Sequence, residues 1–153
     1  MVPQSLTRKQ YLLEVEEHVH AVESAKHDIV VIGGGAVGIE MASELKFVNP
    51  GLNVTLAHSR DELLSSEALP DETKARTLEC LQAEGVEVLM GHRLSKAEKR
   101  LVEGATTYDV EFTNGHSMVA SQVIMAISKS TSTLDYLPKA AVNDDGFAKI
   151  RPT

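Results

Sequence analysis

The sequence predicts an α/β fold: a Rossmann-like order of parallel strands with helices on both faces of the sheet, extended by an antiparallel β-hairpin or meander. Two observations predict the parallel part. An apolar run at 29–32 passes through a glycine-rich turn into a helix with an apolar face, and a second strand-like run follows at 53–58. A third observation predicts the antiparallel part, because apolar and polar residues alternate around the turn dipeptide Asn114-Gly115.

Four glycines occupy the turn after the first strand, and three of them have the spacing G-x-G-x-x-G. In this pattern the first glycine allows a tight turn, the second lets the backbone approach a pyrophosphate, and the third lets helix and strand pack closely. The pyrophosphate would meet the N–H groups at the start of the helix. The alternative is a turn whose glycines serve its shape alone. We predict a Rossmann-type dinucleotide-binding site formed by Gly33, Gly34, Gly35, Ala36, Val37 and Gly38.

The remaining elements follow from periodicity and from residues that start or stop helices. Apolar residues at helical spacing predict an amphipathic helix over 7–25, before the first strand. Pro70 and two acidic residues open a later helix that Gly85 ends, and a third parallel strand follows. The apolar run 123–127 is typical of a strand buried on both faces. We therefore divide the chain into an N-terminal amphipathic helix (1–27), an NAD(P)-binding domain (28–127) and a C-terminal extension (128–153).

Composition excludes several classes of function. A net charge of −7 and a pI near 5.3 give no basic surface for nucleic acid or an anionic membrane. No apolar run is long enough to span a bilayer, and the N-terminus has no signal-peptide core, so an intracellular, cytoplasmic location is expected. The single cysteine, Cys80, cannot form a disulfide within the chain. The histidines and acids lack metal or catalytic spacing, so we predict no metal site and name no catalytic residue.

The order of these parts resembles the central region of pyridine nucleotide-disulfide oxidoreductase-type flavoproteins. The segments that carry the resemblance are IVVIGGGAVGIEMASEL, NVTLAHSRDELL and LQAEGVEVLMGHRL. The chain is most similar to the apoptosis-inducing-factor-like NAD(P)H oxidoreductases, which lack a redox disulfide. In that family this region binds NAD(P)H and is inserted between two halves of an FAD-binding domain. The resemblance implies that Glu40 projects toward the nicotinamide. From the residues alone, Glu40 is equally well explained as an acid in the first turn of a helix.

The chain departs from the family pattern in ways that concern the flavin. It has no second glycine fingerprint for FAD, and residues 127–132 lack the family's glycine and Pro-Asn. We therefore expect FAD only if a partner chain or a missing domain supplies it. The first hypothesis is an NAD(P)H-binding domain, or component, of a flavin-dependent oxidoreductase that passes hydride to a flavin or quinone-like acceptor. The alternative is a stand-alone Rossmann module: a nucleotide sensor, an interaction protein or a non-redox enzyme. A flavin-binding partner chain or a homo-oligomer is compatible with the first hypothesis.

The residues after the second strand bear on the choice of nucleotide. An NAD-specific site usually has an acid about twenty residues beyond the fingerprint, where it binds the adenosine ribose. This chain has His58, Ser59 and Arg60 at that place. A hydroxyl and a guanidinium suit a 2′-phosphate, so we expect NAD(P)H binding with a slight preference for NADPH. The alternative is that these three residues form an ordinary solvated loop.

Overall fold

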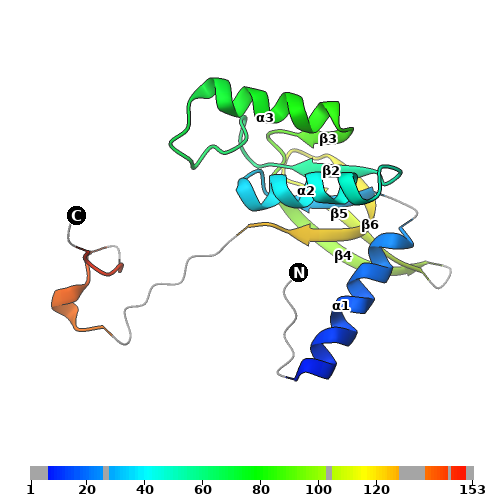
Figure 1. The fold of residues 1–153 in the computed structure, drawn as a ribbon, viewed down its shortest axis with the longest axis horizontal. Coiled ribbons are helices and arrows are strands. Elements are labelled where there is room, and N and C mark those ends of the chain that lie inside the picture. The colour runs from blue at the N-terminus through cyan, green and yellow to red at the C-terminus, as the bar shows by residue number, and fades with distance from the viewer. Residues whose placement is uncertain (1–6, 26–27, 103–104, 128–136, 145, 151–153) are drawn as a thin grey trace.

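The computed structural model describes residues 7–25, 28–102, 105–127, 137–144 and 146–150. Within these residues six strands form one mixed sheet, in the order β3-β2-β1-β6-β5-β4 (Figure 1). The predicted α/β class, with a parallel sheet and an antiparallel meander, is confirmed. The elements are α1 (Arg8–Glu23), β1 (Asp28–Ile32), α2 (Ala36–Val48), β2 (Val54–Ala57), α3 (Asp71–Ala83), β3 (Val86–Leu89), β4 (Leu94–Val102), β5 (Ala105–Phe112), β6 (Ser117–Met125) and the 3-10 helix η2 (Lys139–Ala141).

Strand β6 joins the two parts of the sheet. Near its start it pairs antiparallel with β5, where Tyr108 lies opposite Ala120, and near its end it pairs parallel with β1, where Ile32 lies opposite Met125. The alternating run near 116–120 and the apolar run at 123–127 were expected as separate strands, but most of both belongs to this one strand. One strand can belong to both parts because its first half is buried on one face only, whereas its second half is buried on both faces.

The described helices cover one face of the sheet, which corrects the expectation of helices on both faces. One core cluster contains Ile29 and Val31 of β1 together with side chains from α1, α2 and α3. The other cluster contains the alternate residues Val30 and Ile32, packed against Val110 and Phe112 of β5 and against no described helix. Because side chains alternate along a strand, β1 requires cover on both faces. The antiparallel meander supplies that cover on the second face in place of a helix.

The ends of the helices agree with their sequence signals. The hydroxyl oxygen of Thr7 accepts a hydrogen bond from the Gln10 backbone N–H at the start of α1. Helix α3 begins directly after Pro70 and is followed by Gly85 at φ +81°, a conformation that glycine adopts without strain. Among the described residues no helix is both long and apolar enough to cross a membrane.

The turn between β1 and α2 depends on backbone contacts that leave no room for side chains. A Cβ atom on Gly38 would lie 1.7 Å from the carbonyl oxygen of Gly33. A Cβ atom on Gly33, where φ is +122°, would lie 2.6 Å from the carbonyl oxygen of Ala126, just after β6. The Gly33 N–H also donates to the carbonyl oxygen of Ala57 at 2.9 Å. The start of α2 is therefore fixed against the ends of β1, β2 and β6.

We predict that Gly38→Ala lowers the free energy of unfolding by at least about 2 kcal/mol, because the new methyl group must displace backbone. Gly35→Ala is the matched control. A Cβ atom there meets nothing within 4 Å, so the expected change is below about 1 kcal/mol. Urea unfolding of both variants and the parent chain measures the difference. Equal stability of the two variants would show that the close approach of α2 to β1 is not required.

Candidate functional site

The fingerprint loop lies at the carboxyl end of β1, and its glycines are not alike. Side chains at Gly33, Gly34 and Gly38 would each collide with neighbouring atoms of the protein. Gly35, the N-cap residue of α2, would meet nothing within 4 Å. Packing therefore explains three of the glycines and leaves the fourth unexplained. The space beside Gly35 opens onto the start of α2.

The N-terminal end of α2 is suited to an anion. No side chain caps this helix, and its first turn contains no acidic residue. The first N–H groups of a helix have no partner within the helix, and they lie at the positive end of its dipole. Ala36 and Val37, in this first turn, are exposed. Glu40 is also exposed but lies beyond the first turn, so the interpretation of Glu40 as a first-turn acid was wrong.

The loop after β2 holds the peptide groups of Gly34 from both sides. The Gly34 N–H donates to Nδ1 of His58 at 3.0 Å, and the Leu64 N–H donates to the Gly34 carbonyl oxygen at 2.8 Å. A Cβ atom on Gly34 would lie 2.7 Å from both the His58 ring and the Leu63 side chain. The two loops that sequence analysis assigned to pyrophosphate and ribose therefore form one packed unit.

These contacts define the tautomer of His58. Because Nδ1 accepts from Gly34, the hydrogen of the neutral ring is on Nε2, which lies 3.1 Å from Oγ of Ser65 and donates to it. Desolvation by burial lowers the pKa of His58, and the positive charge of Arg60 lowers this pKa further. The neutral ring is the form that can accept the Gly34 hydrogen bond.

Arg60 contacts two hydroxyl groups that sequence analysis missed. Its NH1 group donates to Oγ of Ser65 at 3.0 Å and to Oγ of Ser66 at 2.9 Å. Ser65 Oγ thus accepts from both Arg60 and His58, so its own hydrogen remains for a further acceptor. Arg60 also keeps guanidinium N–H groups that these two bonds do not use. Ser59 is half-buried and shows no side-chain hydrogen bond within the described part of the chain.

Two histidines that look scattered in the sequence lie together elsewhere. The ring centroids of His92 and His116 are 5.1 Å apart, and both rings contact Phe112, at 5.2 and 5.7 Å. These contacts connect the segment before β4 with the β5–β6 turn. No group of three or more His, Cys, Asp or Glu side chains in the described residues is placed to hold a metal ion. Cys80 is an exposed free thiol.

His58 gives folding stability a pH dependence of defined sign. Its pKa in the folded chain is below the unfolded value of about 6.5, so its contribution is present above about pH 6.5. That contribution is lost as the pH falls through the folded-state pKa, because the unfolded chain binds a proton that the folded chain resists. We expect His58→Asn, whose Oδ1 can accept from Gly34, to lose less stability on acidification. Urea unfolding between about pH 7.5 and about pH 5 tests this, and identical pH profiles would contradict it.

The chain is similar to known oxidoreductases. The profile of the family described as pyridine nucleotide-disulphide oxidoreductase matches residues 2–150. Oxidoreductase OXR1 of Ajellomyces capsulatus is 49% identical over 150 residues, which are 97% of this chain and 32% of that protein. Human ferroptosis suppressor protein 1 is 34% identical over 110 residues, covering 72% of this chain and 29% of that protein. FAD-dependent oxidoreductase FVFD30 of Flammulina velutipes is 31% identical over 141 residues, covering 91% and 41%.

Solved structures show the same fold at lower sequence identity. A water-forming NADH oxidase from Lactobacillus brevis, bound to NADH, superposes with a TM-score of 0.61 at 17% identity, covering 80% of this chain and 24% of that one. A ferredoxin reductase from Rhodopseudomonas palustris gives a TM-score of 0.61 at 20% identity, covering 76% and 27%. The chain spans roughly a third of the length of the relatives above. Its family profile covers nearly the whole chain, and the protein therefore belongs to the pyridine nucleotide-disulphide oxidoreductase family.

Proposed function

We propose that residues 28–127 are the NAD(P)H-binding domain of, or a component of, a flavin-dependent oxidoreductase that passes hydride to a flavin or quinone-like acceptor. The open space beside Gly35 carries this proposal, because Gly35 is the one fingerprint glycine that the protein's own packing does not require. A pyrophosphate there would accept hydrogen bonds from the first N–H groups of α2. The redox chemistry would be that of the cofactors, while the chain binds and orients the dinucleotide.

The names of relatives support the same class of chemistry. One relative is described as an FAD-dependent oxidoreductase, and one structural neighbour is described as bound to NADH. The chain matches between 29% and 41% of the length of each relative compared above. We propose that FAD is held by a partner chain or a further domain, toward which residues 128–153 lead. Residues 128–136, where that connection would begin, lie outside the described residues. Glu40 would then face the nicotinamide end of the dinucleotide.

The hydroxyl groups around Arg60 support a preference for NADPH. A 2′-phosphate at this place would meet the guanidinium of Arg60 and the free hydroxyl hydrogen of Ser65, with Ser66 beside them. Within the described residues, no carboxylate forms a hydrogen bond or an ion pair with Arg60. His58 would act by holding the Gly34 peptide in place for the pyrophosphate. Ser59 would border the adenosine ribose that carries this 2′-phosphate.

Calorimetric titration with NADH, NADPH and FAD tests the proposal directly. We expect both nicotinamide nucleotides to bind at one site, NADPH more tightly, and FAD to bind only when a flavin-binding chain is added. Binding of NAD(P)H with no response to any flavin component would favour the stand-alone Rossmann module. Binding of neither nicotinamide nucleotide would contradict the proposal.

Gly35→Val is expected to abolish NAD(P)H binding while the fold is retained. The branched side chain would fill the space proposed for the pyrophosphate, and its Cβ atom meets no protein atom within 4 Å. Circular dichroism and urea unfolding verify the fold, and calorimetry measures binding. A folded variant that keeps its affinity for NADPH would show that the loop is structural only.

Arg60→Ala is expected to weaken NADPH binding by roughly 1.5–3 kcal/mol and to leave NADH nearly unchanged, since only NADPH has the 2′-phosphate. Ser66→Ala should have the same sign and a smaller size. Arg76→Ala, on the exposed side of α3, is the control for removing a surface charge. His58 is unsuited to this test because its loss would release Gly34 and affect both nucleotides. Equal losses for NADH and NADPH in Arg60→Ala would mean that the side chain only supports the loop.

A further inference from the structure

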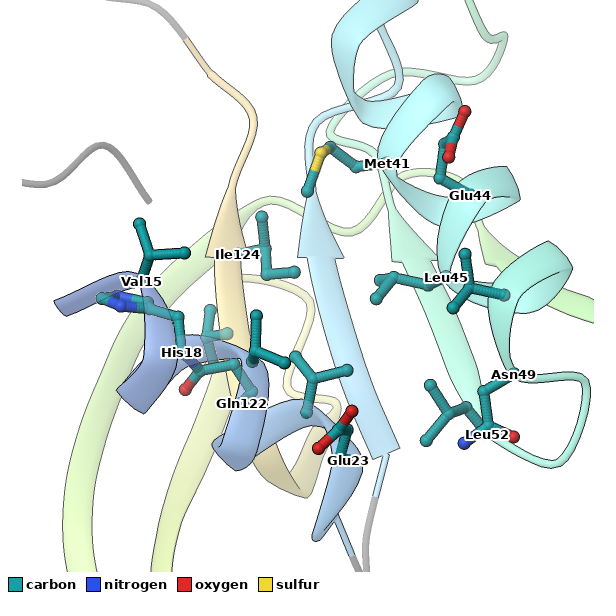
Figure 2. A pocket seen from close by; sticks show the side chains of 14 residues that line it. Val15, His18, Glu23, Met41, Glu44, Leu45, Asn49, Leu52, Gln122 and Ile124 are labelled. Carbon is teal, nitrogen blue, oxygen red and sulfur yellow. The ribbon is translucent and has the colours of Figure 1, made fainter. Parts of the chain in front are cut away.

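An apolar groove lies between α1 and α2, on the helical face of the sheet. It has a volume of about 400 Å³ and is lined mainly by aliphatic side chains, while β6 forms part of its floor (Figure 2). This volume is within the range of sites that bind small molecules. The aliphatic lining includes Val15 and Val22 of α1, Met41 and Leu45 of α2, and Ile124 of β6.

Gln122 places one polar group among these aliphatic side chains. The residue is only 8% exposed and lines the groove, where Figure 2 shows its side chain extending from β6 toward α1. Its side-chain amide makes no hydrogen bond to any described residue. An amide buried without a partner is costly, so a partner from outside the chain would be favoured at this point. The amide can both donate and accept, as a hydroxyl group can.

The surroundings of the groove restrict what can occupy it. The carboxylates of Glu23 and Glu44 are exposed at its rim, so a negatively charged head group would be repelled. Strand addition by a peptide is excluded here, because β1 pairs with β2 and β6, and β6 pairs with β1 and β5, so neither strand has a free edge. The other polar residues of the lining, His18, Glu23, Glu44 and Asn49, are half-buried or exposed. Gln122 is therefore the buried polar residue of the lining, which fits one oxygen and not a row of peptide groups.

We propose that this groove is a binding site for an uncharged, largely apolar small molecule whose single hydroxyl or carbonyl oxygen hydrogen-bonds to the side-chain amide of Gln122. The site is separate from the dinucleotide loop. Gln122 lies opposite Ile29, near the start of β1, whereas Gly33 follows the end of that strand. Its occupancy does not depend on the function proposed for the loop.

Titration of the full chain with three matched compounds tests this site. The probes are 4-propylphenol, propylbenzene and 4-propylbenzoate. Their binding is measured from the methyl NMR signals of Val15, Val22 and Ile124. We expect 4-propylphenol to bind roughly two- to tenfold more tightly than propylbenzene, the scale of one neutral hydrogen bond. The benzoate should bind most weakly, because its charge meets Glu23 and Glu44.

The variant Gln122→Leu should bind 4-propylphenol and propylbenzene equally and keep its affinity for NADPH. Gln82→Leu makes the same change at an exposed position of α3 and should leave the phenol preference intact. Equal affinity of the parent chain for 4-propylphenol and propylbenzene would overturn the proposal. Binding of neither compound would also overturn it. Sedimentation at the titration concentrations adds a further test. A dimer that buries these methyl groups would identify a second copy of the chain as the occupant and would also overturn it.

Discussion

The arrangement of this protein depends on the close approach of α2 to the carbonyl oxygen of Gly33. Residue 38 has no room for a Cβ atom because the backbone of the helix passes directly beside that oxygen. This contact places the first turn of α2 at the carboxyl end of β1, beside the end of β6 and the start of the loop after β2. Everything proposed for the dinucleotide follows from that placement, since it aims the helix N-terminus at one open space.

The loop after β2 makes the site more than a glycine turn. His58 and Leu64 hold the two peptide groups of Gly34, and Ser65 connects His58 with Arg60. The region proposed for the 2′-phosphate is thus connected by hydrogen bonds to the region proposed for the pyrophosphate. We infer that a change at His58 alters the affinity for both nucleotides, whereas a change at Arg60 alters the affinity for NADPH and not that for NADH.

The sequence was sufficient for features that local signals determine. The glycine spacing located the strand, turn and helix, while Pro70 and Gly85 located α3 within a residue or two. The sequence was not sufficient for features that tertiary packing determines. Nothing local indicates that β6 continues from the meander into the parallel sheet, or that Val110 and Phe112 take the place of helices on the second face. The contacts of Arg60 with Ser65 and Ser66 depend on how the loop folds back. The run of small polar residues after Leu64 was their only signal.

Backbone amide NMR during titration with NADPH measures the central claim most directly. The account predicts that the amides of residues 34–38 shift first and furthest, with a second set at 58–66, and that Gly35→Val removes both sets together. Shifts confined to other parts of the sheet, or unchanged amides at 34–38 under saturating NADPH, would contradict the assignment of the space beside Gly35 to the pyrophosphate.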